Sequence, residues 1–381
     1  MMIKKLAIAA AVASLFSVPA LADITVGITV SATGPASALG APQKNTVPLL
    51  PTTIAGEKVN YVVLDDATDP TQASKNAKKL VDEYKADIVF GSSTVSNSLA
   101  VTEVMVESKT PLMALAPMNL PPEKGHWVFR MPQHNAIMAG AIADDMVTNG
   151  VKSIGMIGFA DPYGESFMAE MKKAAEAKGI QISVTEKFNR ADTSVMGQSV
   201  KLVAAKPDAV LIVASGTPSA LPHSTLVERG FKGRIYQTHG AIGRDVLRVG
   251  GKALEGGIFV SGPIIVGDQL PDSHPLKASI KTYVTAYEEK YGAGSLGPQG
   301  GHLWDAYALL AAAVPTAMAK AKPGTPEFRA ALRDAIESSK DVVGVHGVFN
   351  MSPTDHFGHD ERARVLVKVE NGAYKLMGKQ D

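Results

Sequence analysis

The chain of 381 residues has no cysteine, only two tryptophans and almost no net charge. Without cysteine no disulfide can hold the fold, so its stability has to come from a buried core. The low aromatic content argues against a broad carbohydrate-stacking surface. The balance of 38 basic against 37 acidic side chains argues against nucleic acid or an anionic membrane surface as a partner.

Familiar catalytic motifs are missing as well. The sequence has no G-x-S-x-G elbow, no Walker loop, no H-E-x-x-H and no paired-carboxylate arrangement. We therefore predict that the protein is not an enzyme, with no catalytic residue, no cofactor and no metal. A hydrolase with an unmarked site stays open as a weak alternative, which assays with ester substrates would test.

An apolar run opens the chain. Lys4 and Lys5 precede an apolar stretch, Leu6 to Val18, and Ala20-Leu21-Ala22 forms a small-x-small cleavage site before Asp23. This pattern is typical of a secretory signal peptide, and the stretch is too short for a membrane span. We expect residues 1–22 to be removed on export, and the rest of the chain is long enough for two domains.

Strand and helix patterns then alternate. Runs of β-branched residues predict strands, and apolar residues at helical spacing, such as Ala73, Ala77 and Leu80, predict helices. The predicted strands of this first unit are 24–30, 59–64, 88–90, 111–115 and 127–130, with helices at 71–85 and from 97 onward. This order predicts a parallel sheet covered by helices on both faces.

The pattern restarts after Pro132. Helices are predicted at 136–149, 164–178, 193–205 and 219–229, between strands at 153–159, 182–187, 209–214, 234–237 and 257–261. Residues 276–339 are all-helical, with helices at 277–291, 302–320 and 326–338. A strand at 347–349 follows, and a hairpin, 363–369 and 373–377, ends the chain with a turn at Glu370-Asn371-Gly372.

The helical segment cannot bury its apolar faces alone, so we expect it to pack back on the first unit. The predicted fold class is α/β, with two discontinuous Rossmann-like lobes joined by a three-crossing hinge near 130–133, 261–263 and 343–350. Lobe 1 comprises 23–131 with 265–342, and lobe 2 comprises 132–264 with 343–381. Ligands bind beyond the carboxyl ends of the strands in such sheets, so a cleft that closes is expected between the lobes.

Residues 86–109 contain the clearest candidate for one wall of that cleft. The strand 88–90 breaks at Gly91 into a hydroxyl-rich loop, and a helix restarts near Asn97. Free backbone amides and the positive dipole at the start of a helix favour an anion. A helix cap alone would also explain the Ser and Asn residues, but the position at a sheet edge between two lobes favours ligand contact.

Several short motifs, taken in order, resemble a known family. They are Thr33-Gly34-Pro35 with Gly40, Leu64-Asp65-Asp66-Ala67-Thr68-Asp69-Pro70, the loop 91–98, Asp161-Pro162-Tyr163-Gly164 and Trp304-Asp305-Ala306. The chain resembles the periplasmic substrate-binding proteins of ABC importers that have the type I fold, and more closely the branched-chain amino acid (Leu/Ile/Val) binding family. The resemblance covers essentially all of residues 23–381. It implies a monomeric periplasmic protein that captures a small-molecule carboxylate in the cleft by lobe closure and delivers it to membrane permease subunits.

The resemblance also implies the ligand-binding residues. In lobe 1, hydroxyls and backbone amides hold a ligand carboxylate, and in lobe 2 Tyr163 forms an aromatic wall, although a packed turn tyrosine is the alternative. The full set of expected ligand contacts is Ser37, Ser93, Thr94, Ser96, Ala116, Pro117, Asn135, Tyr163, Ser215, Gly216 and His239.

Two of these residues depart from the family pattern. Amino-acid binders of this family place acidic residues against the ligand's α-ammonium, where this chain has Asn135 and His239. A buried ammonium without a carboxylate would be poorly compensated. We therefore predict a small organic acid that lacks the amine, of the benzoate or phenylpropenoid type, and the ending 347–358 resembles the aromatic-acid subset of the family. A branched-chain amino acid ligand, or a ligand-sensing role on the same fold, stays open.

Two further groups of polar residues could serve as a metal site or as cleft contacts. Asp355, His356, His359 and Asp360 lie within six residues, but the sequence shows no third ligand that would fix a metal geometry, so a polar hinge loop is favoured. His302 and its neighbours open a predicted helix, where capping and packing are favoured over contact with the cleft.

Overall fold

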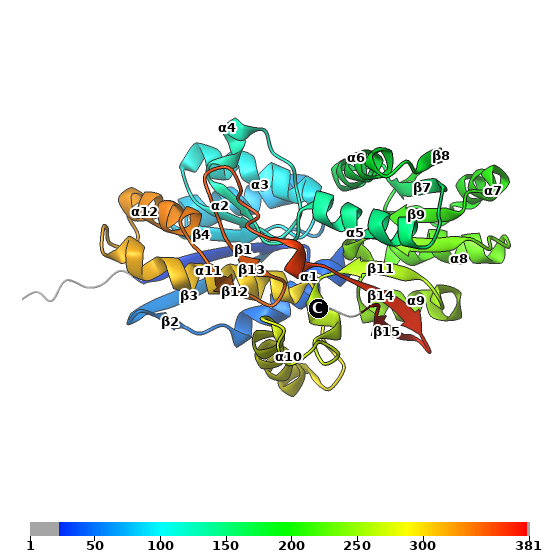
Figure 1. Ribbon diagram of the computed structural model, residues 1–381. Helices are drawn as coiled ribbons and strands as arrows, with labels where there is room; N and C mark the ends of the chain where they lie inside the picture. Colours follow the sequence, from blue (N-terminus) through cyan, green and yellow to red (C-terminus); the bar gives the residue numbers. More distant parts are fainter. Residues whose placement is uncertain (1–22, 379–381) are drawn as a thin grey trace, which may run out of the picture.

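Two mostly parallel sheets organise the computed structural model, which describes residues 23–378 (Figure 1). The predicted signal peptide, residues 1–22, lies outside the described residues. Within 23–378, no helix is long and apolar enough to cross a membrane. The α/β fold class with two Rossmann-like units is confirmed.

The first sheet has the strand order β2-β3-β1-β4-β5-β6 and is parallel apart from the short edge strand β2. Its strands are β1 (Ile24–Val30), β2 (Thr53–Ile54), β3 (Glu57–Asp65), β4 (Ile88–Gly91), β5 (Leu112–Ala114) and β6 (Val128–Arg130). Its connecting helices are α1 (Ser37–Thr46), α2 (Pro70–Asp82), α3 (Val95–Ser108) and the single turn α4 (Pro122–Gly125).

The second sheet has the order β15-β14-β11-β10-β9-β7-β8. Its strands are β7 (Ser153–Phe159), β8 (Gln181–Phe188), β9 (Ala209–Val213), β10 (Arg234–Gln237), β11 (Ile258–Ser261), β14 (Val365–Glu370) and β15 (Ala373–Leu376). Its helices are α5 (Asn135–Thr148), α6 (Pro162–Ala177), α7 (Met196–Ala205), α8 (Ala220–Glu228) and α9 (Arg244–Gly250). The predicted hairpin β14–β15 joins this sheet antiparallel to β11, and α9 was not predicted.

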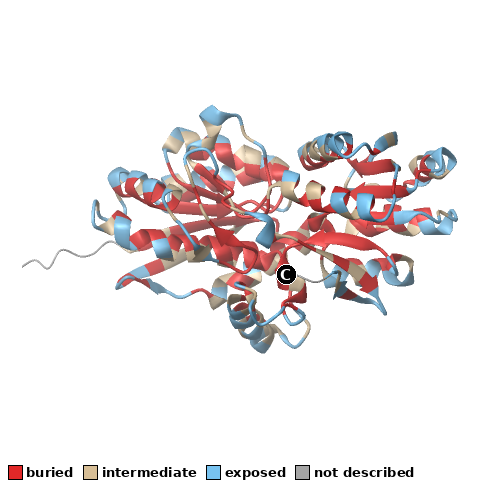
Figure 2. Cartoon of the chain, viewed as in Figure 1, coloured by how far each residue is buried: buried red, intermediate tan, exposed pale blue. Residues whose placement is uncertain are grey.

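The all-helical segment covers the first sheet, as predicted. It consists of α10 (Lys277–Tyr291), α11 (Gly300–Met318) and α12 (Pro326–Glu337), followed by the small ladder β12 (Val342–Val343) and β13 (Val348–Phe349). Apolar residues of α11 and α12 pack on one face of the sheet with Ile88 and Phe90, while α2 and α3 pack on the other face with Val89. Because successive strand residues point to opposite faces, both faces of β4 are buried, and Figure 2 shows the buried layer running through the sheet.

Three of the helices begin with the same local signal. Asp69, Asp161 and Thr325 each accept a hydrogen bond from a backbone amide of the first turn, and a proline follows each of them at the first helical position. A capping oxygen satisfies a free amide, and proline loses nothing there because that N–H has no partner in the helix. The strong signal explains why these helix starts lie within two residues of the predicted ones.

The division into lobes at 131, 264 and 342 remains a prediction. Phe349 and Met351 follow the last of these boundaries and nevertheless pack in the core of the first unit. His356 also stacks on Phe129 of β6, with ring centroids 4.4 Å apart. The chain thus stays on the first unit for several residues after 342 before it enters β14.

Candidate functional site

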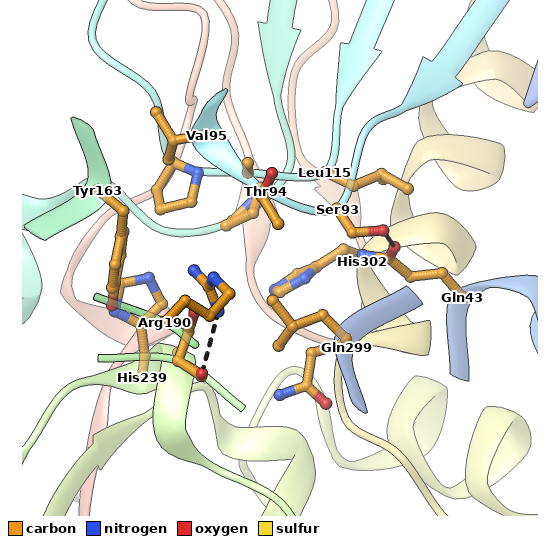
Figure 3. A pocket seen from close by; sticks show the side chains of 16 residues that line it. Gln43, Ser93, Thr94, Val95, Leu115, Tyr163, Arg190, His239, Gln299 and His302 are labelled. Carbon is orange, nitrogen blue, oxygen red and sulfur yellow. Dashed lines mark hydrogen bonds between the residues drawn. The ribbon is translucent and has the colours of Figure 1, made fainter. Parts of the chain in front are cut away.

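The carboxyl edges of the two sheets enclose a cavity of about 50 Å³ (Figure 3). Both units contribute walls, as expected for a ligand site at strand ends in α/β folds. The lining residues are Leu39, Gln43, Ser93, Thr94, Val95, Leu115, Ala116, Pro117, Pro132, Tyr163, Arg190, Ser215, His239, Gly240, Gln299 and His302. Of the predicted ligand contacts, seven line this cavity: Ser93, Thr94, Ala116, Pro117, Tyr163, Ser215 and His239.

The β4–α3 loop forms the wall that belongs to the first unit. Thr94 caps α3, since its Oγ1 accepts from the amide of Asn97 at 3.3 Å. The hydroxyl of Ser93 donates to Gln43 Oε1 at 2.6 Å and accepts from the amide of Ser31 at 2.9 Å. The capping interpretation and the cavity-wall interpretation therefore both hold, because Thr94 does both.

The buried carboxylate of Asp66 binds this loop to the rest of the first unit through hydrogen bonds. It accepts from Ser92 Oγ at 2.5 Å, Asn97 Nδ2 at 2.8 Å and Ser31 Oγ at 2.7 Å. The amide of Thr68 donates to it as well, at 3.1 Å. The side chains of Ser92 and Asn97 are thus used inside the first unit. Because the amides of Asn97 and Ser98 bond to Thr94, the amides of Val95 and Ser96 are the ones at the start of α3 without a partner within the helix.

Tyr163 forms the facing wall from the start of α6. Its hydroxyl donates to Thr238 Oγ1 at 2.8 Å, and Thr238 in turn donates to the carbonyl of Ala214 at 2.9 Å. Burial raises the pKa of Tyr163, so the phenol stays protonated. Because its hydroxyl is already bonded within the second unit, the ring is the part of Tyr163 that remains for the cavity, and its role as an aromatic wall for a ligand stays a prediction.

Two neutral histidines complete the lining. Burial lowers the pKa of His239 to about 3 and that of His302 well below its usual value. Among residues 23–378, neither imidazole has a hydrogen-bond partner for either ring nitrogen. His302 was expected to serve capping and packing instead, but Gln299 is the N-cap residue of α11, without a side-chain cap, and His302 faces the cavity (Figure 3). The capping part of that expectation is therefore wrong, whereas the packing part holds, because the buried ring of His302 also stacks on His346.

Arg190 is the charged lining residue among those that were not predicted from the sequence. It lies just after β8, stacks over the ring of Phe159 at 4.2 Å and donates from Nη1 to Ser215 Oγ at 3.0 Å. Nη2 lies 3.4 Å from Asp161 Oδ2. Burial lowers the pKa of Arg190 although Asp161 opposes the shift, and the guanidinium remains charged at neutral pH.

The remaining predicted contacts lie outside the cavity lining. Ser37 is the first residue of α1, Ser96 lies in the first turn of α3, and Gly216 lines a neighbouring groove. Asn135 is buried, and its Nδ2 donates to Ser166 Oγ of α6 at 3.0 Å. Asn119, after β5, donates to the same hydroxyl at 3.1 Å, so Ser166 joins the two units. The ligand-binding roles of these four residues stay predictions.

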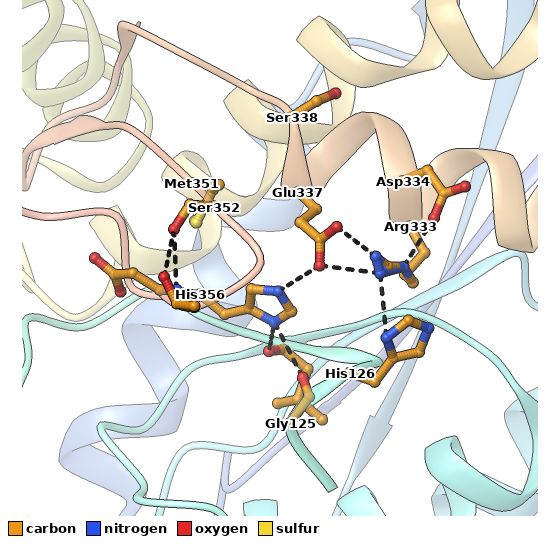
Figure 4. Close-up of polar contacts among 12 residues, drawn as sticks. Gly125, His126, Arg333, Asp334, Glu337, Ser338, Met351, Ser352 and His356 are labelled. Carbon is orange, nitrogen blue, oxygen red and sulfur yellow. Dashed lines mark hydrogen bonds and ion pairs between the residues drawn. The ribbon is translucent and has the colours of Figure 1, made fainter. Parts of the chain in front are cut away.

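The 355–360 segment has structural contacts of its own (Figure 4). His356 Nε2 lies 3.0 Å from Glu337 Oε1, and its Nδ1 bonds to the carbonyls of Gly125 and Val128. Asp355 accepts from the amides of Phe357 and Gly358, and Asp360 pairs with Arg362. No group of three or more potential metal ligands occurs in the described part of the chain.

The chain was compared with known protein families, curated proteins and solved structures. The family described as "Periplasmic binding protein" matches residues 23–373. A solved extracellular ligand-binding receptor from Rhodopseudomonas palustris is 46% identical, with a TM-score of 0.92, and the alignment covers 93% of this chain and 99% of that one. A Leu/Ile/Val-binding protein homologue from Brucella suis is 25% identical over 68% of this chain and 71% of its own length.

A more distant structure shares the fold alone. It is a solute-binding protein of an R. palustris ABC transporter, solved in complex with benzoate, and it is 19% identical with a TM-score of 0.77 over 94% of this chain and 96% of that chain. The predicted type I periplasmic binding fold and the likeness to Leu/Ile/Val-binding proteins are both confirmed. The chain belongs to the periplasmic binding protein family.

Proposed function

We propose that this protein binds a small organic carboxylate without an α-amino group and delivers it to an ABC permease. The observation that carries the proposal is the charge of the cavity. Arg190 is the one cationic side chain among the lining residues of the described chain, and no aspartate or glutamate lines the cavity, since Asp161, which pairs with Arg190 at 3.4 Å, lies outside the lining. A carboxylate would find a partner there, whereas an ammonium would be buried without one.

The ligand carboxylate would lie between two sources of positive potential. Thr94 and Val95 at the start of α3 line the cavity from the first unit, and Arg190 lines it from the second unit (Figure 3). Each contribution is strengthened where water is excluded. The apolar side chains Leu39, Val95, Leu115 and Pro117, with the Tyr163 ring, suit a flat hydrophobic body, which supports an aromatic acid.

The cavity is too small for such a ligand as the units now lie. Its volume of about 50 Å³ is below the roughly 150 Å³ of a cavity known to hold benzene. Entry therefore requires the units to part, which breaks contacts such as Asn119 to Ser166 and Gln299 Nε2 to the carbonyl of Ile242 at 2.7 Å. Membership of the family and a cavity walled by both units support the proposal that the ligand is captured in the periplasm by closure of the units.

Isothermal titration calorimetry on the mature chain tests the ligand class. The panel is benzoate, 4-hydroxybenzoate, cinnamate, leucine and isoleucine. We expect at least one acid to bind in the micromolar range or tighter, and leucine and isoleucine to give no heat. Tight binding of leucine with no heat from the acids would contradict the proposal and favour the amino-acid ligand that the names of the curated relatives suggest.

A further inference from the structure

The segments that cross between the two units meet at one glutamine. Gln133, between β6 and α5, is buried, and its Nε2 donates to the carbonyl of Ala363 at 2.9 Å. The same nitrogen lies 3.4 Å from the carbonyl of His346. One side chain of the first crossing therefore contacts His346 of the third crossing and Ala363 just before β14, both more than 200 residues away in the chain.

Gly262 allows the second crossing to join them. A Cβ at this position would lie 2.4 Å from His346 Nδ1 and 2.6 Å from Gln133 Nε2, closer than atoms can approach. Its φ of −71° is open to any residue, so space rather than backbone freedom requires glycine here. All three crossings thus touch at Gln133, Gly262 and His346, a set that we call the crossing cluster.

His346 links the crossing cluster to the cavity. Its ring stacks on that of His302, which lines the cavity, with centroids 4.0 Å apart and planes inclined by 29°. His346 Nε2 lies 2.9 Å from the carbonyl of Pro298, just before α11. A carbonyl only accepts, and burial lowers the pKa of His346 to about 4, so the neutral ring carries its proton on Nε2.

Helix α11 fixes the same crossing through a second residue. The carboxyl of Asp305 accepts from the amides of Val345 at 2.6 Å and His346 at 3.1 Å. His302 and Asp305 are three residues apart and so share one face of α11. The start of this helix therefore contacts the cavity and the third crossing at once.

We propose that His346 is a positioning residue that couples occupancy of the cavity to the angle between the two units through His302. The proposal rests on the proposed function, since it takes the cavity as the ligand site. A ligand that packs on His302 would press on the His346 ring and so on all three crossings. Differential binding to one arrangement of the units then shifts their population.

Small-angle scattering and calorimetry on two matched variants test the coupling. His346→Phe keeps a ring over His302 but cannot donate to Pro298. His223→Phe is the control, because His223 is equally buried and loses one bond, to Gln237 at 3.0 Å, within the second unit and away from the cavity. Benzoate and cinnamate are the probes.

We expect His346→Phe to show a larger ligand-free radius of gyration than wild type and affinity for the bound probe about tenfold weaker, the size of one lost hydrogen bond. His223→Phe should lower the melting temperature and leave both quantities unchanged. His346→Gln, which keeps a donor near the position of Nε2, should recover most of the wild-type affinity. Equal effects of His346→Phe and His223→Phe, or no recovery by His346→Gln, would overturn the coupling.

The two proposals fail in different ways. If neither probe binds wild type, the proposed ligand class fails, and the coupling is then decided by ligand-free scattering. In that case a radius of gyration for His346→Phe equal to wild type contradicts the coupling, and a larger one supports it.

Discussion

Arg190 is the residue on which the anion preference of the cavity depends. We expect Arg190→Met to weaken binding of the acid ligand about 100-fold, since a buried charge-assisted pair contributes roughly 2–3 kcal/mol. Methionine keeps the aliphatic contact with Phe159 but removes the charge. Calorimetry with the best acid of the panel measures the loss.

Arg130→Met is the matched control for Arg190. Arg130 also stacks over a phenylalanine, Phe357, at 4.2 Å, but it lines a separate groove and not the cavity. Its replacement should leave the affinity within about twofold. Equal affinity of both variants would show that Arg190 does not contact the ligand.

The cavity-lining residues that were predicted and those that were not differ in their position relative to predicted strands. Ser93, Ala116 and Tyr163 follow predicted strands directly, and the rule that ligands bind at strand ends is enough to find them. Arg190 also follows a strand, so the same rule applied to the end of β8 would have found it. Gln299 and His302 lie at the start of a helix far along the chain, and only the packing of α11 on the first sheet brings them to the cavity.

At the scale of elements, the β4–α3 loop depends on a carboxylate that is not part of it. Asp66 accepts hydrogen bonds from Ser92 and Asn97 of the loop and from Ser31 after β1. In Asp66→Asn an NH₂ group replaces one carboxylate oxygen, so a hydrogen-bond donor faces the donors that this oxygen had accepted from. We expect the free energy of unfolding to fall by about 2–4 kcal/mol, the cost of unsatisfied buried polar groups, together with weaker ligand binding.

Urea denaturation of Asp66→Asn beside Asp65→Asn measures that cost. Asp65 also accepts hydrogen bonds, from Thr33 and Ala67, but these are exposed to solvent. The control should therefore lose under about 1 kcal/mol. A loss for Asp66→Asn no larger than that of the control would mean that the loop is held by other contacts.

The elements themselves were largely predictable from hydrophobic periodicity. Strand β7 and helix α10 lie at the predicted residues, because each is bounded by a change of pattern. Helix α9 was missed, since a seven-residue helix between Gly243 and Gly251 gives almost no periodic signal. The antiparallel edge strand β2 has two residues and was missed for the same reason.

At the scale of the whole molecule, the contacts between the units were beyond sequence reasoning. The amide of Asn135, which is predicted to contact the ligand, binds Ser166, and Ser166 also binds Asn119. Nothing in the local sequence around Asn119 or Ser166 indicates that they meet. Such pairs are decided by how two separately predictable sheets dock, which is a property of the assembled surfaces.

Buried neutral histidines should make the stability of the whole protein depend on pH. Burial lowers the pKa of His223 and His346 to about 4 and of His239 and His359 to about 3, and His302 shifts the same way. In the unfolded chain each would bind a proton below a pKa of about 6.5. The unfolded state therefore binds more protons between pH 6.5 and 4, and the free energy of unfolding must fall as the pH is lowered through this window.

Two buried carboxyls oppose this trend, because burial raises the pKa of Asp87 and of Asp305. Burial raises the pKa of Asp305 to about 8, so the folded protein holds a proton that the unfolded carboxyl releases above pH 4. This contribution makes the protein more stable toward lower pH over the same window. Two carboxyls stand against five histidines, and each group contributes at most about 1.4 kcal/mol per pH unit, so the histidines decide the sign.

Denaturation by urea at pH 7.5, 6.5, 5.5 and 5.0 measures the balance. We expect little change from 7.5 to 6.5 and a loss on the order of 5 kcal/mol from 6.5 to 5.0, enough to unfold a protein of ordinary stability. His223→Phe removes one of the five groups, and because Asp305 and Asp87 together offset between one and two of them, it should make the slope shallower by about one quarter to one third. A stability that stays constant down to pH 5.0 would mean that these imidazoles take up protons in the folded state, and the two cavity histidines would then add positive charge to the ligand site instead of neutral hydrogen-bonding groups.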